Sequence, residues 1–464
     1  MVQKIYIKTY GCQMNIYDSE RIQDLMAMSG YQYTDSIKEA NLLVINTCHI
    51  REKASEKLFS ELGRVKIHKE AMQKKGEQMI VAVAGCVAQA EGKEIFKRAP
   101  IVDIIVGPES YQTLPDLVGK LLREKSKQIN LEFDANHKFD NIFHHNDTTK
   151  FSSFLTIQEG CDKFCTFCVV PYTRGAEYSK NYQQIVNDAN ILSSQGAKEI
   201  YLLGQNVNAY HFEHSEVPNK ESRNKTKFDL ADLIKEIANI KNIERIRYTT
   251  SHPADMNDSL INAHRDIEKL MPFLHLPVQA GSNQILKAMN RKHSREDYFK
   301  IIEKLRSVKP DMGLSSDFIV GFPGETDQDF KQTLDLVEKI GFAQCYSFKY
   351  SPRPGTPAHD DDNQVPEHIK VERLAELQAL LTKQQIAFNK SFENKTMKIL
   401  FEKEAPKSNK LGAENKPQIW GKSPWLQSVV VDLPLGTDIK NYIGKIIDVK
   451  IIKSRPSSLF AELC

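Results

Sequence analysis

Apolar and polar residues alternate in blocks along the first third of the chain, and one pattern occurs three times. Apolar, β-branched runs of strand length cover Lys4–Tyr10, Asn41–Thr47 and Met79–Gly85, and a cysteine follows each run. The cysteines are 36 and 38 residues apart, which leaves room for a helix and a return. We therefore expect parallel βα units in residues 1–123, with strand ends that bring together Cys12, Cys48 and Cys86.

A second, longer alternation predicts a barrel in residues 151–388. Helical stretches separate six strand-like runs, which are Phe154–Ile157, Glu199–Leu203, Arg245–Thr250, Pro272–Pro277, Gly313–Val320 and Ala343–Tyr350. Six βα units are too few to close a barrel of eight, so we expect an open or partial (β/α)6 barrel. Its functional groups should lie at the carboxyl ends of the strands. The polar residues 124–150 in front of it predict a linker.

Short strands return near the end of the chain, separated by turns that contain glycine and proline. They are Met397–Glu402, Gln418–Gly421, Ser428–Val431 and Lys445–Lys453. This spacing predicts a small β-barrel of oligonucleotide-binding type over residues 389–456. Trp420 and Trp425 are the only tryptophans of the chain. Base stacking and barrel packing are equally good explanations for them.

Composition narrows the class of protein. The 464 residues allow about three domains, and they contain no run of about 18 apolar residues that would predict a membrane span. We expect a cytoplasmic protein whose eight cysteines serve as metal ligands rather than in disulfides. The net charge is +3, and residues 391–464 alone carry +4. A basic tail is compatible with RNA binding, although a solvated charged surface is the commoner explanation.

Cys161, Cys165 and Cys168 form a CxxxCxxC loop directly after the first predicted barrel strand. Three thiolates this close together can bind three irons of a cubane [4Fe–4S] cluster and leave the fourth iron open. Structural zinc needs a fourth ligand, and no second Cys or His pair lies nearby at the required spacing. We therefore favour a cluster over a zinc knuckle or a disulfide.

Cys12, Cys48 and Cys86 allow two interpretations. Any one of them alone is explained more simply as a buried thiol that packs as a small apolar residue. Packing does not require a cysteine at the same place in three successive units, whereas binding of a second, auxiliary [4Fe–4S] cluster does. Of the remaining cysteines, we expect Cys345 to pack in the core and the terminal Cys464 to be disordered.

Glycines and polar residues follow the later barrel strands. Glycine lets the backbone approach a ligand closely, and amide and hydroxyl groups offer hydrogen bonds, although loop capping explains any one such residue alone. The candidate ligand-binding residues at these strand ends are Gly204, Gln205, Asn206, Ser251, Gln279, Ile319, Val320 and Gly321. His252 and His293 are candidates for a general base or for a structural hydrogen bond.

The cysteine loop, with Glu159-Gly160 before it and Val169 to Gly175 after it, resembles the methylthiotransferase branch of the radical S-adenosylmethionine (SAM) enzymes. The resemblance implies that the open iron binds SAM and that an electron from the cluster splits SAM to a 5′-deoxyadenosyl radical. It implies that Gly204–Asn206 contacts the SAM amino group and that Ile319–Gly321 lies near the adenine. It also identifies the last module as an RNA-binding TRAM domain, in which Gly421-Lys422-Ser423 replaces the frequent Gly-Arg-Thr.

Gly11 to Asn15, Ile50 to Ala54 and Ser351 to Ala358 are most similar to the branch of this family that modifies tRNA. What this resemblance implies is methylthiolation of C2 of N6-isopentenyladenosine at position 37, in the anticodon stem-loop. The implied cofactors are two [4Fe–4S] clusters, one for each cysteine triplet, and two molecules of SAM. We expect tRNA, SAM, and an electron donor and a sulfur donor of unknown identity as partners, no membrane, and a monomer.

Two alternatives stay open. A methylthiotransferase could act on threonylcarbamoyl-adenosine in tRNA or on a ribosomal-protein side chain, although the ribosomal-protein branch typically has Pro-Lys where this chain has Gln13-Met14. From a different class, the chain could be a non-catalytic iron–sulfur protein that binds RNA or senses redox state. Formation of 5′-deoxyadenosine from SAM under reduction separates the enzymes from the last group.

Overall fold

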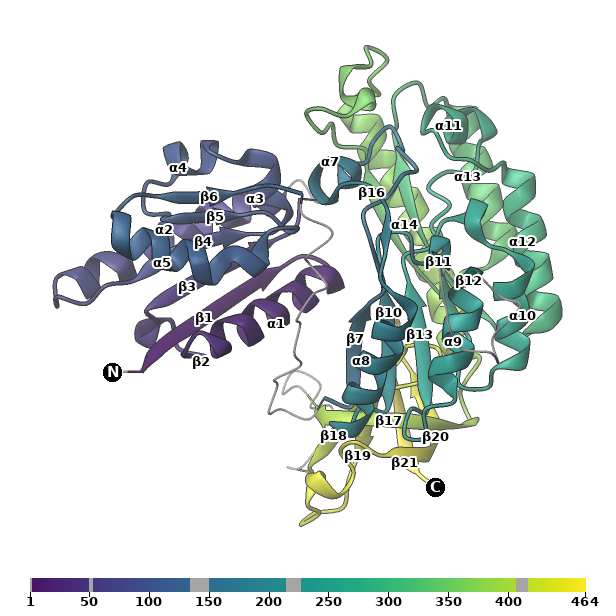
Figure 1. Ribbon diagram of the computed structural model, residues 1–464. Coiled ribbons are helices and arrows are strands. Elements are labelled where there is room, and N and C mark those ends of the chain that lie inside the picture. The colour runs from purple at the N-terminus through teal and green to yellow at the C-terminus, as the bar shows by residue number, and fades with distance from the viewer. Residues whose placement is uncertain (1, 50–52, 134–149, 214–226, 406–415) are drawn as a thin grey trace.

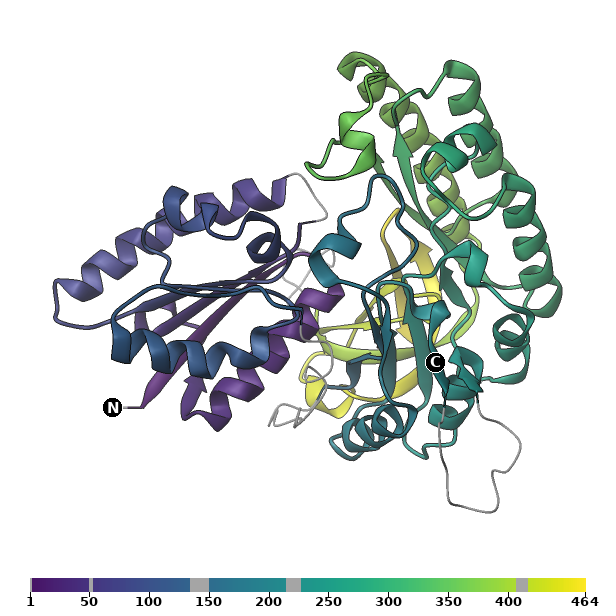
Figure 2. The ribbon, with the colours of Figure 1, turned by 45° about the horizontal axis from the view of Figure 1, so that its top comes forward.

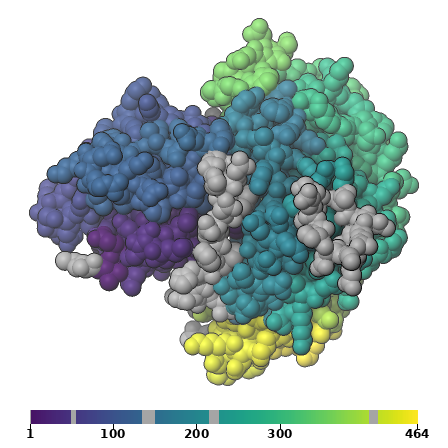
Figure 3. Space-filling model, in the orientation of Figure 1, coloured from purple at the N-terminus to yellow at the C-terminus, as the bar shows by residue number. Residues whose placement is uncertain are grey.

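The computed structural model describes residues 2–49, 53–133, 150–213, 227–405 and 416–464. These residues form an N-terminal α/β domain, a central partial barrel and a small C-terminal β-barrel (Figure 1). The space-filling view shows the N-terminal domain, in purple to blue, as a separate lobe beside the central barrel in teal to green (Figure 3). The expected mixed α/β architecture is confirmed.

The N-terminal domain is a parallel sheet between two layers of helices. Its strands, in the spatial order β2-β1-β3-β4-β5-β6, are Tyr31–Tyr33, Gln3–Tyr10, Leu42–Thr47, Ile80–Ala84, Ile104–Val106 and Gln128–Asn130. Helices α1 and α5 cover one face, and α2, α3 and α4 cover the other. The helices α1 to α5 span Gln13–Met28, Lys53–Gln73, Cys86–Glu91, Glu94–Arg98 and Leu114–Glu124. Buried β-branched strands between two helical layers are typical of parallel sheets.

The central domain has six parallel strands that do not close on themselves. The strands β7, β10, β13, β14, β15 and β16 are Ser152–Thr156, Glu199–Leu203, Arg245–Thr249, Phe273–His275, Gly313–Val320 and Gln344–Lys349. They pair as two sheets of three, and the bridge from Ile246 to Leu270 joins the sheets. The predicted partial (β/α)6 barrel is confirmed, and each predicted strand is within two residues of the observed one.

Helices cover the outer side of the barrel strands, away from the N-terminal domain (Figure 2). The helices α8 to α14 span Tyr182–Ser194, Leu230–Ala238, Asp258–Asp266, Asn283–Ala288, Arg295–Val308, Asp327–Ile340 and Glu367–Lys390. Three of them, α9, α12 and α13, begin with a capping box, in which the first side chain and an aspartate three residues later bond each other's backbone N–H groups. Strand β11 (His211–Glu213) pairs antiparallel with β12 (Lys227–Asp229), and residues 214–226 between them lie outside the described residues.

The C-terminal module is a closed barrel of five strands in the order β17-β18-β19-β21-β20. The strands β17 to β21 span Thr396–Glu404, Gln418–Lys422, Ser428–Asp432, Ile446–Ser454 and Ser458–Leu463. The sequence analysis ended this module at residue 456 and expected Cys464 to be disordered, and both expectations are wrong. Strand β21 pairs with β19 on one side and with β20 on the other, and so closes the barrel.

The small barrel sits at the amino-terminal end of the barrel strands. Arg245 and Arg247, at the start of β13, donate hydrogen bonds to backbone oxygens of Lys398, Lys422, Ser423 and Pro424. Glu199, at the start of β10, accepts a hydrogen bond from Arg247. The segment Gly421-Lys422-Ser423, a candidate for RNA contact in the sequence, therefore lies against the central barrel, and Ser423 is fully buried.

Two further observations concern boundaries and membranes. The sequence predicted a linker over residues 124–150, but this segment contains strand β6. The strand consists of three half-buried residues that pair with β5 at the edge of the sheet. Residues 134–149 of that segment lie outside the described residues. In the described parts of the chain, no helix is long and apolar enough to cross a membrane.

Candidate active site

Cys12, Cys48 and Cys86 all lie just beyond the carboxyl ends of neighbouring strands of the N-terminal sheet. Cys12 precedes α1, Cys48 follows β3, and Cys86 is the first residue of α3. Glycines at positive φ precede Cys12 and Cys86. A Cβ atom on Gly11 would lie 2.3 Å from Cβ of Cys48, so only glycine allows these two loops to meet this closely.

The three thiols interact with one another. Cys48 hydrogen-bonds both other cysteines, and these bonds lower the pKa of Cys12 to about 7 and hold the pKa of Cys86 well below its usual range. The same bonds, together with burial, raise the pKa of Cys48. Cys86 also hydrogen-bonds Arg174 and Thr173 of the central domain. Since thiolates are the form that binds metals, this environment favours metal binding.

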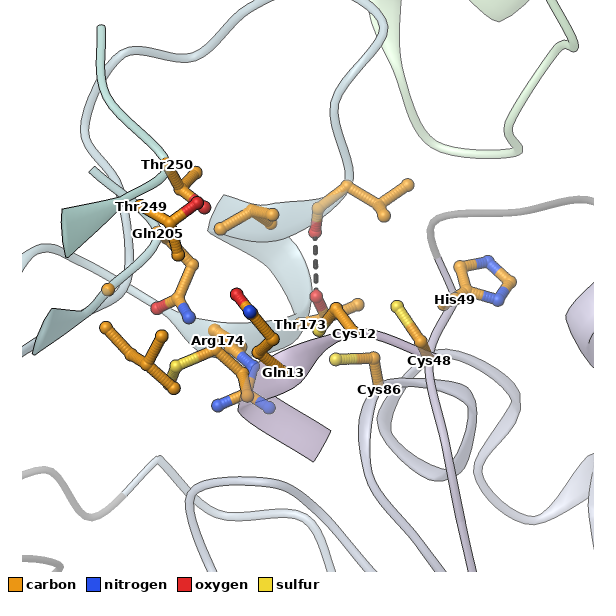
Figure 4. Close-up of a pocket in the computed structure, with 15 residues that line it drawn as sticks. Cys12, Gln13, Cys48, His49, Cys86, Thr173, Arg174, Gln205, Thr249 and Thr250 are labelled. Carbon is orange, nitrogen blue, oxygen red and sulfur yellow. Dashed lines mark hydrogen bonds between the residues drawn. The ribbon is translucent and has the colours of Figure 1, made fainter. Parts of the chain in front are cut away.

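These cysteines line a cavity of about 130 Å³ between the N-terminal domain and the barrel, here called the thiol cavity. Figure 4 shows the cysteines on one side, Gln205, Thr249 and Thr250 on the other, and Thr173 and Arg174 of α7 (Val170–Arg174) between them. Gln205 follows the carboxyl end of β10, Thr249 is the last residue of β13, and Thr250 follows it. The N-terminal thiols therefore face the end of the barrel at which catalytic groups are expected.

A buried ion cluster joins the two domains beside the thiol cavity. Arg174 donates hydrogen bonds to Asp18 in α1 and to Glu159 in β8 (Gln158–Glu159). All three side chains are almost completely buried. The two carboxylates and the nearby Cys86 hold the pKa of Arg174 well above its usual range, despite its burial. The guanidinium is therefore a fixed positive charge at the domain boundary.

Cys161, Cys165 and Cys168 lie on a loop, residues 161–168, that follows β8 and precedes α7. Gly160, at φ +72°, starts this cysteine loop, and a Cβ atom there would lie 1.8 Å from the backbone oxygen of Ala176. Burial raises the pKa of Cys161 to about 11 and that of Cys168 to about 12. These thiols stay protonated near neutral pH until a metal displaces the proton.

The turn Gly204–Asn206 is bound directly to the start of the cysteine loop. The side-chain oxygen of Gln158 accepts hydrogen bonds from the backbone N–H groups of Gln205 and Asn206. In return, the Gln205 side chain accepts from the N–H of Gly160 at 2.6 Å. Gln205 thus contacts the cysteine loop and also lines the thiol cavity. Gln158, which makes this arrangement possible, has no signal in the sequence.

The loop after β13 is hydrogen-bonded to the cysteine loop and to the turn Gly204–Asn206. Asp255 accepts hydrogen bonds from Lys163 of the cysteine loop and from the Asn206 side chain. Ser251, Asn206 and His252 are more than 90% buried, and each has a side-chain polar atom without a hydrogen-bond partner among the described residues. Buried polar atoms of this kind are normally satisfied, so they indicate a place for a polar ligand.

The remaining candidates, at the carboxyl ends of β14 and β15, differ in what they can contact. Ile319 and Phe167 of the cysteine loop pack on the same apolar cluster, so Ile319 faces the loop. Val320 packs in the main core instead, which leaves only its backbone for a ligand. The N–H of Gly321 already donates to Glu325. Gln279, at φ +77°, exchanges backbone hydrogen bonds with β15.

His252 and His293 lie together near the cysteine loop, with ring centroids 5.5 Å apart. Burial lowers the pKa of His252 to about 2 and that of His293 to about 3, and the positive charge of Arg291 adds to both effects. Both rings are therefore neutral near pH 7. The sequence left the role of these histidines open between a general base and a structural residue. In this environment neither ring carries an extra proton near pH 7.

The two tryptophans of the small barrel have different surroundings. Trp425 packs on Phe392 and donates its ring N–H to the backbone oxygen of Asp311, which assigns it to packing between domains. Trp420 is partly exposed, and the ammonium groups of Lys403 and Lys422 lie over its ring. A base could stack only at Trp420 without disrupting the domain contact.

The donor sets fit iron–sulfur clusters. Within the described ranges, no three His, Cys, Asp or Glu side chains are arranged to hold a single metal ion. A cubane makes a different demand, because each of its thiolates binds a separate iron. Cys12, Cys48 and Cys86 meet that demand, because they offer three sulfurs beside the thiol cavity and two of them have a lowered pKa. Cys161, Cys165 and Cys168 also offer three sulfurs, on a loop whose start is fixed by the turn at Gly160.

Two family models match the chain. Residues 4–107 match a family described as uncharacterized protein family UPF0004, and residues 155–337 match the radical SAM superfamily. The chain is 56% identical to proteins of Rickettsia rickettsii (strain Sheila Smith) and Rickettsia bellii (strain RML369-C), each named tRNA-2-methylthio-N(6)-dimethylallyladenosine synthase. These alignments span 464 residues and cover 100% of each chain.

Solved structures show the same fold at low identity. The radical SAM methyltransferase TsrM of Kitasatospora setae, solved with tryptophan and a SAM analog, aligns with a TM-score of 0.55 at 10% identity and covers 77% of this chain and 75% of its own. The cobalamin-dependent radical SAM enzyme OxsB aligns with a TM-score of 0.51 at 12% identity, over 82% of this chain and 56% of its own. These likenesses establish the fold alone.

Proposed function

We propose that this chain, which belongs to the tRNA-2-methylthio-N(6)-dimethylallyladenosine synthase family of radical SAM enzymes, adds a methylthio group to C2 of N6-isopentenyladenosine at position 37 of tRNA. The observation that carries the proposal is the position of Gln205 between the two cysteine triplets. This one side chain contacts the start of the cysteine loop and lines the thiol cavity. Two separate cysteine triplets thus serve one end of the barrel.

The two triplets would hold one [4Fe–4S] cluster each. When bound, the cluster at Cys161, Cys165 and Cys168 supplies the electron that splits SAM, and the cluster at Cys12, Cys48 and Cys86 supplies the site for the transferred sulfur. An aromatic C–H bond such as that of adenine C2 is a poor acid and a poor electrophile, which is why cofactor chemistry is needed.

The chain's own residues would bind and orient SAM. The turn Gly204–Asn206, held by Gln158, offers polar groups for its amino end, and Ile319 offers an apolar surface for its adenine. The unpartnered polar atoms of Asn206 and Ser251 lie in the loops around this place. Neutral His252 would accept or donate a hydrogen bond rather than carry a charge.

The tRNA would reach this place with its target base flipped out of the anticodon loop, because the reacting atoms lie within the barrel end. The C-terminal barrel would contact the RNA backbone through exposed lysines on β17 and β20, including Lys398, Lys450 and Lys453. Since the small barrel is docked at the opposite end of the strands, it would hold a distant part of the tRNA rather than the target base. A tRNA substrate implies a cytoplasmic location.

The test is anaerobic reconstitution of the full-length chain, followed by reaction with SAM, dithionite, sodium sulfide as the sulfur source and tRNA that carries N6-isopentenyladenosine. Nucleoside mass spectrometry should detect the 2-methylthio product, and Cys86→Ala and Cys165→Ala should each abolish it. Cys86→Ala should still form 5′-deoxyadenosine, whereas Cys165→Ala should not. Absence of product with the wild-type chain, in the presence of about eight irons per chain, would contradict the proposal.

Matched substrates separate the alternatives. Product only on tRNA with threonylcarbamoyl-adenosine, or only on a ribosomal protein, would reassign the target within the same chemistry. A reconstituted chain that forms no 5′-deoxyadenosine under reduction would indicate a non-catalytic iron–sulfur protein.

A further inference from the structure

The C-terminal end of helix α11 holds the cysteine loop over four consecutive residues. Thr166 of the loop donates its hydroxyl to the backbone oxygen of Ala288 at 2.9 Å and its N–H to that of Met289 at 3.1 Å. The Asn290 side chain donates to the backbone oxygens of Lys163 and Phe164, at 3.3 and 2.8 Å. No sequence motif pointed to this helix end.

The fourth residue of this helix end, Arg291, is charged and contacts a cysteine sulfur. A guanidinium nitrogen of Arg291 lies 3.4 Å from Sγ of Cys165 and is oriented to donate to it. A second guanidinium nitrogen donates to the backbone oxygen of Pro277 at 2.6 Å, which fixes the direction of the first. Cys165 itself is 9% exposed. The charge therefore acts on the sulfur in a place where water screens it little.

The end of α11 is built to aim this side chain. The N–H of Arg291 bonds the oxygen of Leu286, the N–H of Asn290 bonds that of Lys287, and Asn290 is left-handed at φ +58°. This is a Schellman motif, which terminates a helix with a fixed chain direction. The conformation of Asn290 thus serves two purposes, since its backbone ends the helix and its side chain holds the loop.

The other charged side chains at the loop have their own partners. Lys163 pairs with Asp255, and Asp162 accepts the N–H of Glu177. The neighbouring rings of His252 and His293 carry no charge near neutral pH. The thiol cavity has a corresponding arrangement, because Arg174 hydrogen-bonds Cys86 there. Each cysteine triplet is therefore contacted by one arginine.

We propose that Arg291 is a positioning residue that sets how easily the cluster at Cys161, Cys165 and Cys168 is reduced, while Asn290 holds the loop that binds it. This inference rests on the cluster of the proposed function. Reduction adds one negative charge to a cluster, and hydrogen bonds and positive charge at its sulfurs favour the reduced form. The donation to Cys165 would therefore raise the reduction potential and make SAM cleavage accessible to a weaker reductant.

The test is a redox titration of reconstituted full-length chain, followed by electron paramagnetic resonance of the signal that responds to SAM. Arg291→Gln should keep the cluster and shift its midpoint to a more negative potential, and a tenfold loss of the reduced form at fixed potential corresponds to about 59 mV. Arg291→Lys, which retains the charge without the planar fork, should fall between Arg291→Gln and wild type.

Two variants separate tuning from structure. Asn290→Gly keeps the left-handed backbone but removes both loop contacts, so it should lose iron to a chelator faster without moving the midpoint of the remaining cluster. Arg295→Gln is the matched control, because Arg295 is a largely buried arginine four residues away that binds Gly281, Gln332 and Asp335 and not the cysteine loop. It should leave the midpoint unchanged.

A midpoint of Arg291→Gln equal to that of wild type and Arg295→Gln would overturn the proposal. Loss of the cluster in Arg291→Gln, with full iron in Arg295→Gln, would also overturn it and assign Arg291 to cluster retention. The titration needs no tRNA. A chain that shows the shift but forms no methylthio product would therefore contradict the proposed function and not this inference.

Discussion

Arg174 of the central domain donates a hydrogen bond to Asp18 of the N-terminal domain, across 156 residues of sequence. Both side chains are at least 96% buried, and Glu159 completes the cluster. A buried carboxylate without its cation is costly, because the protein cannot replace the water it has lost. The pair therefore fixes the N-terminal domain, and with it the thiol cavity, against the barrel.

We predict that Arg174→Gln destabilises the fold by about 3–5 kcal/mol, since it removes the buried guanidinium that bonds the carboxylates of Asp18 and Glu159. Urea unfolding with and without the substitution measures this loss. The control is Arg265→Gln, which breaks an exposed pair with Asp266 and should leave the free energy of unfolding almost unchanged. Equal losses in the two variants would show that the buried cluster does not hold the domains together.

Gly160 and Gly324 form a matched pair of glycines with positive φ. A Cβ atom at Gly160 would lie 1.8 Å from a backbone oxygen, whereas one at Gly324 would have nothing within 4 Å. Gly324→Ala should cost only about 1 kcal/mol, from backbone conformation alone. Gly160→Ala should displace the cysteine loop and lower the iron of the reconstituted chain from about eight to about four atoms. Iron analysis of both variants decides the point, and full iron in Gly160→Ala would contradict it.

Arg247 links the small barrel to the central one. Its guanidinium bonds Glu199 and the backbone oxygens of Ser423 and Pro424, and both charged side chains are buried. Arg247→Met should destabilise the protein by about 3–5 kcal/mol and loosen the small barrel, because the buried Glu199 carboxylate loses the guanidinium that pairs with it.

The double variant Arg247→Met, Glu199→Gln should recover part of the stability, since the buried side chain at position 199 then carries no charge. Thermal unfolding measures the recovery, and limited proteolysis followed by mass spectrometry shows whether the C-terminal barrel is released. A double variant no more stable than Arg247→Met alone would argue against the charge as the cause.

The exposed lysines of the small barrel make a prediction about salt. If Lys450 and Lys453 each contact an RNA phosphate, the double variant with glutamine at both positions should lower the slope of log affinity against log salt by roughly 1.5. Filter binding of tRNA at several salt concentrations measures the slope. Lys300, exposed on the outer helix α12, is the control, and Lys300→Gln should leave the slope unchanged. A tRNA affinity indifferent to the double variant would remove these lysines from the interface.

His264 predicts a pH dependence of stability. Burial lowers the pKa of His264 to about 3, against about 6.5 in an unfolded chain, and its Nε2 atom forms a hydrogen bond of 2.7 Å with the hydroxyl of Tyr248. Between these values the unfolded state binds a proton that the folded state does not. Stability should therefore fall as the pH falls below about 6.5, by up to about 1.4 kcal/mol per pH unit from this residue.

His264→Gln should flatten that dependence between about pH 5 and 6.5 in urea unfolding. Tyr248→Phe keeps the buried ring and removes only its hydrogen bond, so the slope should persist in that variant. A slope that is the same in wild type and His264→Gln would show that other groups govern stability in this range.

The amino-acid sequence by itself determined the elements and the candidate ligands. Period-two and helical patterns gave the six barrel strands, because they report which face of a local segment is buried. The pattern also predicted that cysteines at three successive strand ends would meet, since parallel strands end at one edge of a sheet. The short edge strand β6 and the closing strand β21 escaped this reasoning, because a few half-buried residues give little periodicity.

Only the tertiary structure decided how these parts act on one another. The bond from Arg291 to Cys165 spans 126 residues and that from Arg174 to Asp18 spans 156, and no local pattern encodes either. The same holds for the segment 421–423, which has the composition of an RNA contact but lies against Arg245 and Arg247. Charge and hydrogen-bond partners depend on which distant surfaces pack together, and packing follows from the whole fold rather than from any single segment.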